Sequence, residues 1–156
     1  MEADAALKKE VLALVPQREP FRFIDEIIRL DDDHIVGAYR FREDEYFYRG
    51  HFPGNPITPG VILIETMAQV GVVAFGIYLL ARQKNVRPGE MKLPISLFSL
   101  ADGVEFKQIV RPGERVIVKA KKIYFRKITI KASVVMEKEN GELICSGELS
   151  GVGVDQ

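Results

Sequence analysis

The sequence predicts an α+β fold in which an antiparallel sheet packs on one long central helix. Residues 61–81 form a 21-residue apolar run whose only charge is Glu65, and a helix that is apolar all round belongs in a core. From Lys92 onward the chain alternates apolar and polar residues, as strands do. The predicted helices are too few to alternate with the strands, which favours a sheet packed on one helix.

Prolines and polar clusters mark the boundaries of the elements that precede the central helix. An amphipathic helix is expected over 1–15, ended by Pro16 and Pro20. Residues 21–42 should form a hairpin with its turn at 31–33, where three aspartates follow one another. The segment 51–60 contains three prolines, so it should be a rigid non-helical loop.

The second half begins with the central helix, expected over 60–83. Residues 92–151 should form a β-meander, broken near Asp102–Gly103, with its last turn at Asn140–Gly141. The helix is close to the length that spans a bilayer. Glu65 and Gln69 lie one turn apart within it, and Gly71 weakens it, so a buried helix is favoured over a membrane span.

Length and composition indicate one globular domain, 1–156. The 22 basic residues balance 22 acidic ones, so nothing suggests nucleic acid as a partner. Cys145 is the only cysteine, and the N-terminal residues lack a signal-peptide pattern. A reducing, cytoplasmic location is therefore expected.

His51 and Glu65 are the residues that could carry acid–base chemistry. A histidine can act as a neutral base at physiological pH, and a glutamate among apolar neighbours should resist ionisation and serve as an acid. The amides of Gly60 and Val61 begin the helix and could stabilise an oxyanion. Taken alone, such a histidine is more often structural, and a buried glutamate often only bonds to the backbone.

Other chemistries find no support in the sequence. His34 and His51 are the only histidines and no paired-ligand spacing exists, so no metal site is predicted. No phosphate-binding glycine loop or nucleophile elbow appears, and no cofactor is expected. Cys145 lies in a predicted strand and should fill the core.

The run GHFPGNPITPGVILIETMAQ, residues 50–69, resembles the 3-hydroxyacyl-acyl carrier protein dehydratases of type II fatty acid synthesis, which are hot-dog-fold enzymes. Segments 14–21 and 106–114 extend the likeness over roughly residues 12–150. Glu65, where another branch of the family has aspartate, matches the branch that only dehydrates. Three departures stand out: Gln17 replaces a histidine, Thr66 replaces alanine, and Lys107–Gln108 replaces a more basic pair.

The resemblance implies a single hot-dog domain and a mechanism for converting (3R)-hydroxyacyl to trans-2-enoyl thioesters. His51 would remove the proton at C2, Glu65 would protonate the departing 3-hydroxyl, and Gly60 N–H would polarise the carbonyl. Gln69 would hold Glu65 in place. The histidine and the acid of one site come from two subunits in this family, so a homodimer is the expected minimum. Hexamers of three dimers are common in the branch that carries glutamate.

The expected substrate is an acyl chain on acyl carrier protein, held in an apolar tunnel. Candidates for lining or gating the tunnel are Phe47, Tyr48, Phe52 and Phe98, with core packing as the plainer role of each. The carrier protein is acidic, so a basic rim should bind it. The basic residues that could form this rim are Arg82, Lys84, Arg87, Lys119, Lys121, Lys122, Arg126 and Lys127.

Two other functions stay open at this point. A hot-dog thioesterase would hydrolyse the thioester and release a free thiol. A non-catalytic acyl-binding subunit would bind without turnover, but it has no need for a buried carboxyl group that lowers stability.

Overall fold

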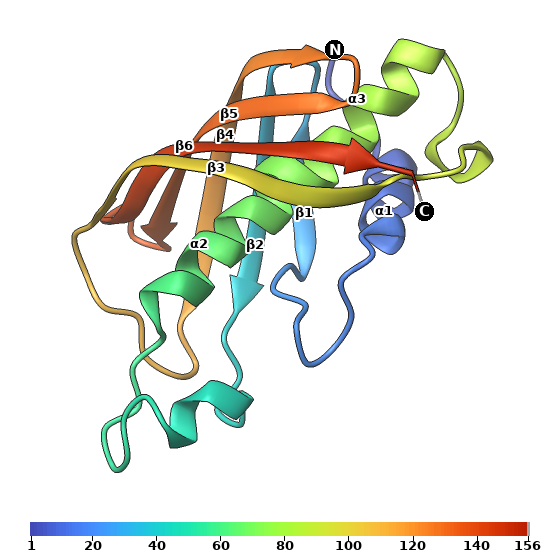
Figure 1. Ribbon diagram of the computed structural model, residues 1–156. Helices are drawn as coiled ribbons and strands as arrows, with labels where there is room; N and C mark the ends of the chain where they lie inside the picture. Colours follow the sequence, from blue (N-terminus) through green and yellow to red (C-terminus); the bar gives the residue numbers. More distant parts are fainter. Residues whose placement is uncertain (156) are drawn as a thin grey trace.

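Six antiparallel strands curve around one long helix in the computed structural model, which describes residues 1–155 (Figure 1). Gln156, the last residue of the expected domain, lies outside the described residues. The strands are β1 (Glu26–Leu30), β2 (His34–Arg40), β3 (Ile95–Phe106), β4 (Arg115–Arg126), β5 (Thr129–Lys138) and β6 (Leu143–Val154). Their order across the sheet is β1-β2-β4-β5-β6-β3. The α+β hot-dog prediction is confirmed.

Both predicted hairpins form, and each turn has a local cause. Between β1 and β2, the Asp31 carboxylate accepts hydrogen bonds from the amides of Asp33 and His34, at 2.9 and 2.7 Å. Between β5 and β6, Gly141 adopts a φ of 92°, which a residue with a Cβ rarely tolerates. These turns set the antiparallel registers on either side.

The predicted meander over 92–151 is wrong for β3. Only β4, β5 and β6 follow one another across the sheet, while β3 lies at the far edge beside β6 and β2 pairs with β4. Nor is β3 broken at Asp102–Gly103, because a register shift between Asp102 and Glu105 absorbs the irregularity within one strand. Alternation along a strand identifies the strand but not its partner, since pairing is decided between segments distant in sequence.

The central helix is continuous from Gly60 to Lys84. It consists of α2 (Gly60–Ala68), a π-helical segment (Gln69–Ala74) and α3 (Phe75–Lys84), and it ends at Asn85 in the left-handed conformation. It is long and apolar enough to cross a membrane, but most of it is buried within this fold. The sheet therefore buries the apolar surface of this helix.

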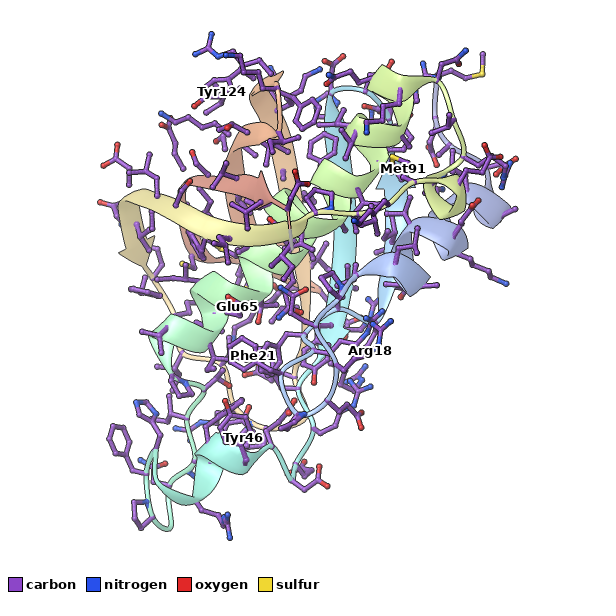
Figure 2. The ribbon with its side chains drawn as sticks, turned by 45° about the vertical axis from the view of Figure 1, so that its right-hand side comes forward. Arg18, Phe21, Tyr46, Glu65, Met91 and Tyr124 are labelled. Atoms are coloured by element: carbon purple, nitrogen blue, oxygen red, sulfur yellow. The ribbon has the colours of Figure 1, made fainter. Side chains whose placement is uncertain are left out.

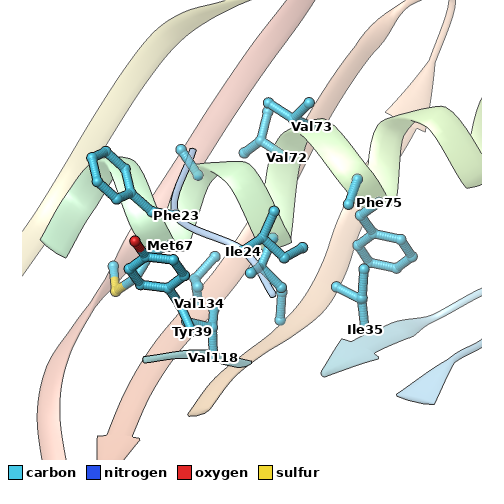
Figure 3. Packing of buried hydrophobic residues seen from close by; sticks show 14 of the residues in the cluster. Phe23, Ile24, Ile35, Tyr39, Met67, Val72, Val73, Phe75, Val118 and Val134 are labelled. Atoms are coloured by element: carbon cyan, nitrogen blue, oxygen red, sulfur yellow. The ribbon is translucent and has the colours of Figure 1, made fainter. Parts of the chain in front are cut away.

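The helix packs closely on the middle of the sheet (Figure 3). A Cβ on Gly71 would lie 2.9 Å from the Val134 side chain and 3.1 Å from that of Ala120. Only glycine therefore allows this approach without movement of β4 or β5. Cys145 on β6 is fully buried in the same core, and burial raises the pKa of its thiol to about 11, consistent with the expected packing role.

An N-terminal helix closes one side of the molecule. Helix α1 (Ala5–Leu14) begins after Asp4, whose carboxylate accepts a hydrogen bond from the Leu7 amide at 2.9 Å. The Ala3 amide donates to Leu30 O on β1 at 2.7 Å, which ties this helix to the sheet. The chain after α1 then turns back towards the central helix and reaches the candidate site.

Candidate active site

Glu65 lies on α2 and faces a small cavity between the central helix and β3. Figure 2 shows it beside the N-terminal loop that carries Phe21 and Arg18. The residues that line this cavity are Gln17, Glu65, Ala68, Val72, Val73, Ser96, Leu97 and Phe98. Burial among these mostly apolar groups raises the pKa of Glu65, and a hydrogen bond from Gln69 opposes the shift. The site thus favours the protonated acid.

Gln69 holds Glu65 through a side chain that is itself fully buried. Its Nε2 donates to Glu65 Oε1 at 2.9 Å and to Phe21 O at 3.0 Å, and its Oε1 accepts from the Phe23 amide at 2.7 Å. The two backbone groups fix which end of the amide faces Glu65, because an amide N–H must donate and a carbonyl oxygen must accept. Gln69 also begins the π-helical segment, a feature frequent at functional sites.

We expect Gln69→Leu to lower the free energy of unfolding by about 2–4 kcal/mol, because Phe21 O and the Phe23 amide would both lose their buried partner. Urea denaturation at neutral pH measures the change. Thr66→Val is a suitable comparison, since the Thr66 hydroxyl is also buried but bonds only to Ile62 O on its own helix. Equal stability of Gln69→Leu and wild type would contradict the role of this network.

His51 stands at the start of the proline-rich loop, outside the Glu65 cavity. Its Nδ1 lies 2.8 Å from Ile57 O, and a carbonyl oxygen only accepts, so the hydrogen is on Nδ1. In the neutral ring Nε2 then carries the lone pair and is the basic atom. The Ile57 amide returns a hydrogen bond to His51 O at 2.8 Å, and the Phe52 ring stacks on the imidazole with centroids 4.1 Å apart.

The start of α2 has two free amide donors. Neither the Gly60 nor the Val61 amide donates a hydrogen bond to another group among residues 1–155. A Cβ on Gly60 would lie 3.0 Å from the Phe106 ring, so a side chain here would crowd β3. The Val61 side chain is exposed. These amides have the orientation and the partial positive charge that stabilise an oxyanion at a helix N-terminus.

The four aromatic tunnel candidates occupy different places. Phe98 lines the Glu65 cavity from β3. Tyr48 is buried under the loop with its hydroxyl 2.6 Å from Thr58 Oγ1, and Phe47 packs edge-on against Phe23 with ring centroids 6.1 Å apart. Phe52 is half exposed beside His51. Phe47 and Tyr48 thus hold the base of the loop, and only Phe98 touches the space in front of Glu65.

One chain does not bring His51 and Glu65 together. No hydrogen bond links them among the described residues, and His51 is not one of the residues that line the Glu65 cavity. The segment 46–59 instead projects beyond the lower end of the sheet as an arm (Figure 1). Gln17, which does share the cavity with Glu65, stood out in the sequence only as a departure from the family pattern. Its proximity becomes visible only once the chain after α1 folds back.

Comparisons with known proteins agree with the fold and the motif. Residues 15–149 match the model of the FabA-like domain. The chain is 36% identical over 140 residues to the 3-hydroxyacyl-[acyl-carrier-protein] dehydratase FabZ of Caldicellulosiruptor saccharolyticus, covering 89% of this chain and 92% of the relative. It is 34% identical to FabZ of Caldanaerobacter subterraneus subsp. tengcongensis, covering 95% and 98%.

A solved structure shares the architecture at much lower identity. A chain of the dehydratase heterocomplex ApeI:P from Xenorhabdus doucetiae superimposes with a TM-score of 0.75 and 14% identity, over 94% of this chain and 92% of that one. At this identity the likeness supports the fold alone.

Proposed function

The chain belongs to the FabA-like family, and from this premise we propose that it is a 3-hydroxyacyl-[acyl-carrier-protein] dehydratase of fatty acid biosynthesis. It converts (3R)-hydroxyacyl thioesters to trans-2-enoyl thioesters and water. The observation that carries the proposal is Glu65, a carboxyl group whose pKa is raised by burial and whose side chain Gln69 holds at a cavity. A protonated acid in an apolar pocket suits the departure of a hydroxyl group.

In the proposed mechanism His51 and Glu65 each carry out one proton transfer. His51 Nε2 takes the proton from C2 of the thioester, and the electron pair of that C–H bond forms the C2–C3 double bond. The C3–O bond breaks, and the departing oxygen takes the proton of Glu65 and leaves as water. Negative charge that gathers on the thioester oxygen during C–H cleavage is stabilised by the Gly60 amide at the start of α2.

The acyl chain is proposed to lie along the central helix. A second, largely apolar cavity adjoins the Glu65 cavity and shares the wall residues Val72, Val73 and Ser96 with it. It extends past Gly76 towards Phe125 on β4. An alkyl chain placed there buries apolar surface, while its C3 stays near Glu65.

A second copy of the chain is proposed to complete each site. The free edge of β3 exposes apolar side chains that a soluble monomer would leave in water: Ile95, Leu97, Phe98, Leu100 and Phe106. Pairing this edge with another copy covers them beside the Glu65 cavity. The projecting arm can then place His51 at the partner's Glu65, giving a homodimer with two shared sites, or a hexamer of three such dimers.

We expect a mixture of two inactive variants to regain activity. In a dimer of one His51→Ala and one Glu65→Gln chain, one site carries both changes and the other carries none. Random exchange in equal amounts should restore about a quarter of wild-type activity, because half of the dimers are mixed and each has one intact site. The measurement is dehydration rate after co-refolding. Activity no greater than the two variants measured separately would contradict the shared site.

The acyl carrier protein is the proposed partner. Basic residues that already form ion pairs within the chain are less available to bind it. Arg82, Arg87, Lys119 and Lys122 already pair with carboxylates within the chain. The better candidates form no ion pair among residues 1–155: Lys84, Lys121, Arg126 and Lys127.

A cytoplasmic location is proposed, as the long apolar helix is buried in the fold and the only cysteine is a buried thiol.

The proposal is tested by following a 2-enoyl and a 3-hydroxyacyl thioester of acyl carrier protein with the purified protein. Reversible interconversion without free thiol is the expected result. Release of thiol would indicate a thioesterase, and binding without turnover on short and long chains would indicate an acyl-binding subunit.

A further inference from the structure

Gln17, one of the residues that line the Glu65 cavity, has a buried polar atom without a partner among the described residues. Gln17 Oε1 is shielded from solvent and accepts no hydrogen bond within residues 1–155, although its side chain lines the cavity beside Glu65. Most buried polar atoms are satisfied, and an unmet acceptor costs about 1–3 kcal/mol. Turning the amide oxygen towards a hydrogen-bond donor bound in the cavity would remove this cost.

The backbone of Gln17 is fixed before any ligand enters. Its carbonyl oxygen accepts hydrogen bonds from Arg22 at 3.1 Å and from Arg18 at 3.2 Å. The Arg22 guanidinium also binds Leu12 O and Val15 O, at 2.8 and 3.1 Å, so it joins this residue to the end of α1. Pro16 restricts the backbone further. The side chain of Gln17 therefore extends from a fixed backbone, so that only side-chain freedom is lost on binding.

The other residues that line the cavity limit which hydrogen-bond donor Gln17 can bind. Glu65 has one oxygen engaged by Gln69, and among described residues no group is bonded to the other. Most remaining wall residues are apolar, with Ser96 as the other polar side chain. A hydroxyl group has one hydrogen to donate and two lone pairs. It can donate to an amide oxygen and accept from a carboxylic acid at the same time.

We infer that Gln17 is a substrate-binding residue whose Oε1 accepts the hydrogen bond of the substrate's 3-hydroxyl group. This inference rests on the proposed dehydratase function. The O–H hydrogen is held by Gln17, which turns a lone pair of the same oxygen towards Glu65, the group that protonates it as it leaves. Gln17 thereby distinguishes a 3-hydroxyacyl chain from the saturated chain of equal length.

The test measures binding without turnover in the His51→Ala background, which keeps both Gln17 and Glu65 and is the same for every comparison. The probes are 3-hydroxyoctanoyl-pantetheine and octanoyl-pantetheine, and the readout is the ratio of their dissociation constants by calorimetry. With Gln17 present, the hydroxylated probe should bind about 10-fold more tightly. Gln17→Met keeps the length of the side chain without the amide, so that only Glu65 still bonds to the hydroxyl. The ratio should fall to about threefold or less, with octanoyl binding changed less than about twofold.

Three results would overturn the inference: no preference with Gln17 present, an undiminished preference in Gln17→Met, or equal weakening of both probes. The last would mean that Gln17 only shapes the cavity. Gln83→Met, which removes an exposed amide on α3, should leave the ratio unchanged. Turnover by the wild type reports on the proposed function and the binding ratio reports on Gln17, so the two can fail separately.

Discussion

Replacing His51 with alanine should lower kcat for dehydration by about 10³-fold, since a positioned general base contributes about 10²–10⁴-fold. The reason lies in the ring's fixed tautomer. Ile57 O binds Nδ1 and leaves Nε2 as the only basic atom, and alanine offers no substitute. Steady-state rates with a 3-hydroxyacyl thioester measure the effect. KM should change little, because the imidazole acts on a C–H bond that it does not bind strongly in the ground state.

His34 provides the matched control. It is the other histidine of the chain and lies on β2 at the hairpin turn, where its backbone amide bonds to Asp31. His34→Ala keeps that backbone bond and should retain wild-type kcat. If both variants lost activity equally, or if His51→Ala alone kept more than about a tenth of it, His51 would not be the base.

Glu65→Gln should lower kcat by a similar factor of about 10²–10⁴, because glutamine fills the same space but has no acidic proton to donate. Glu90→Gln, at an exposed carboxylate far along the chain from the motif, is the control and should keep full activity.

The pH dependence of the dehydration rate tests the role of Glu65 a second time. Burial raises the pKa of Glu65, and the acid is useful only while protonated, so wild-type kcat/KM should fall as pH rises through that raised pKa. An alkaline limb that persists unchanged in the residual activity of Glu65→Gln would assign it to another group.

The same shift predicts how the stability of the wild type depends on pH. The pKa of Glu65 in the folded protein is above its ordinary value, so its favourable contribution is complete below the ordinary glutamate range and is lost as pH rises through the raised pKa. Glutamine remains neutral throughout. Glu65→Gln should therefore match the wild type in urea denaturation at about pH 4 and be the more stable protein at about pH 8. A stability difference that does not depend on pH would contradict the burial of an ionisable group here.

Features of this protein that have a local cause could be predicted from its sequence. The apolar run 61–81 marks the central helix, Asn140–Gly141 marks a turn, and the run 50–69 carries both candidate catalytic residues at fixed spacing. The i,i+4 spacing of Glu65 and Gln69 also placed the two side chains on one helix face, and their side chains are 2.9 Å apart in the structure. Each of these features depends on residues within a few turns of one another.

Contacts between segments distant in sequence could not be predicted and become visible only in the folded chain. The position of β3 beside β6 depends on pairing between residues about 50 apart, such as Phe98 and Gly151, which no local pattern encodes. The same holds for Gln69, whose partners Phe21 and Phe23 come from the loop after α1. Gln17 joins the Glu65 cavity through that loop as well. Local patterns report propensity and periodicity, whereas partners for strand edges and buried polar atoms are chosen by the packing of the whole chain.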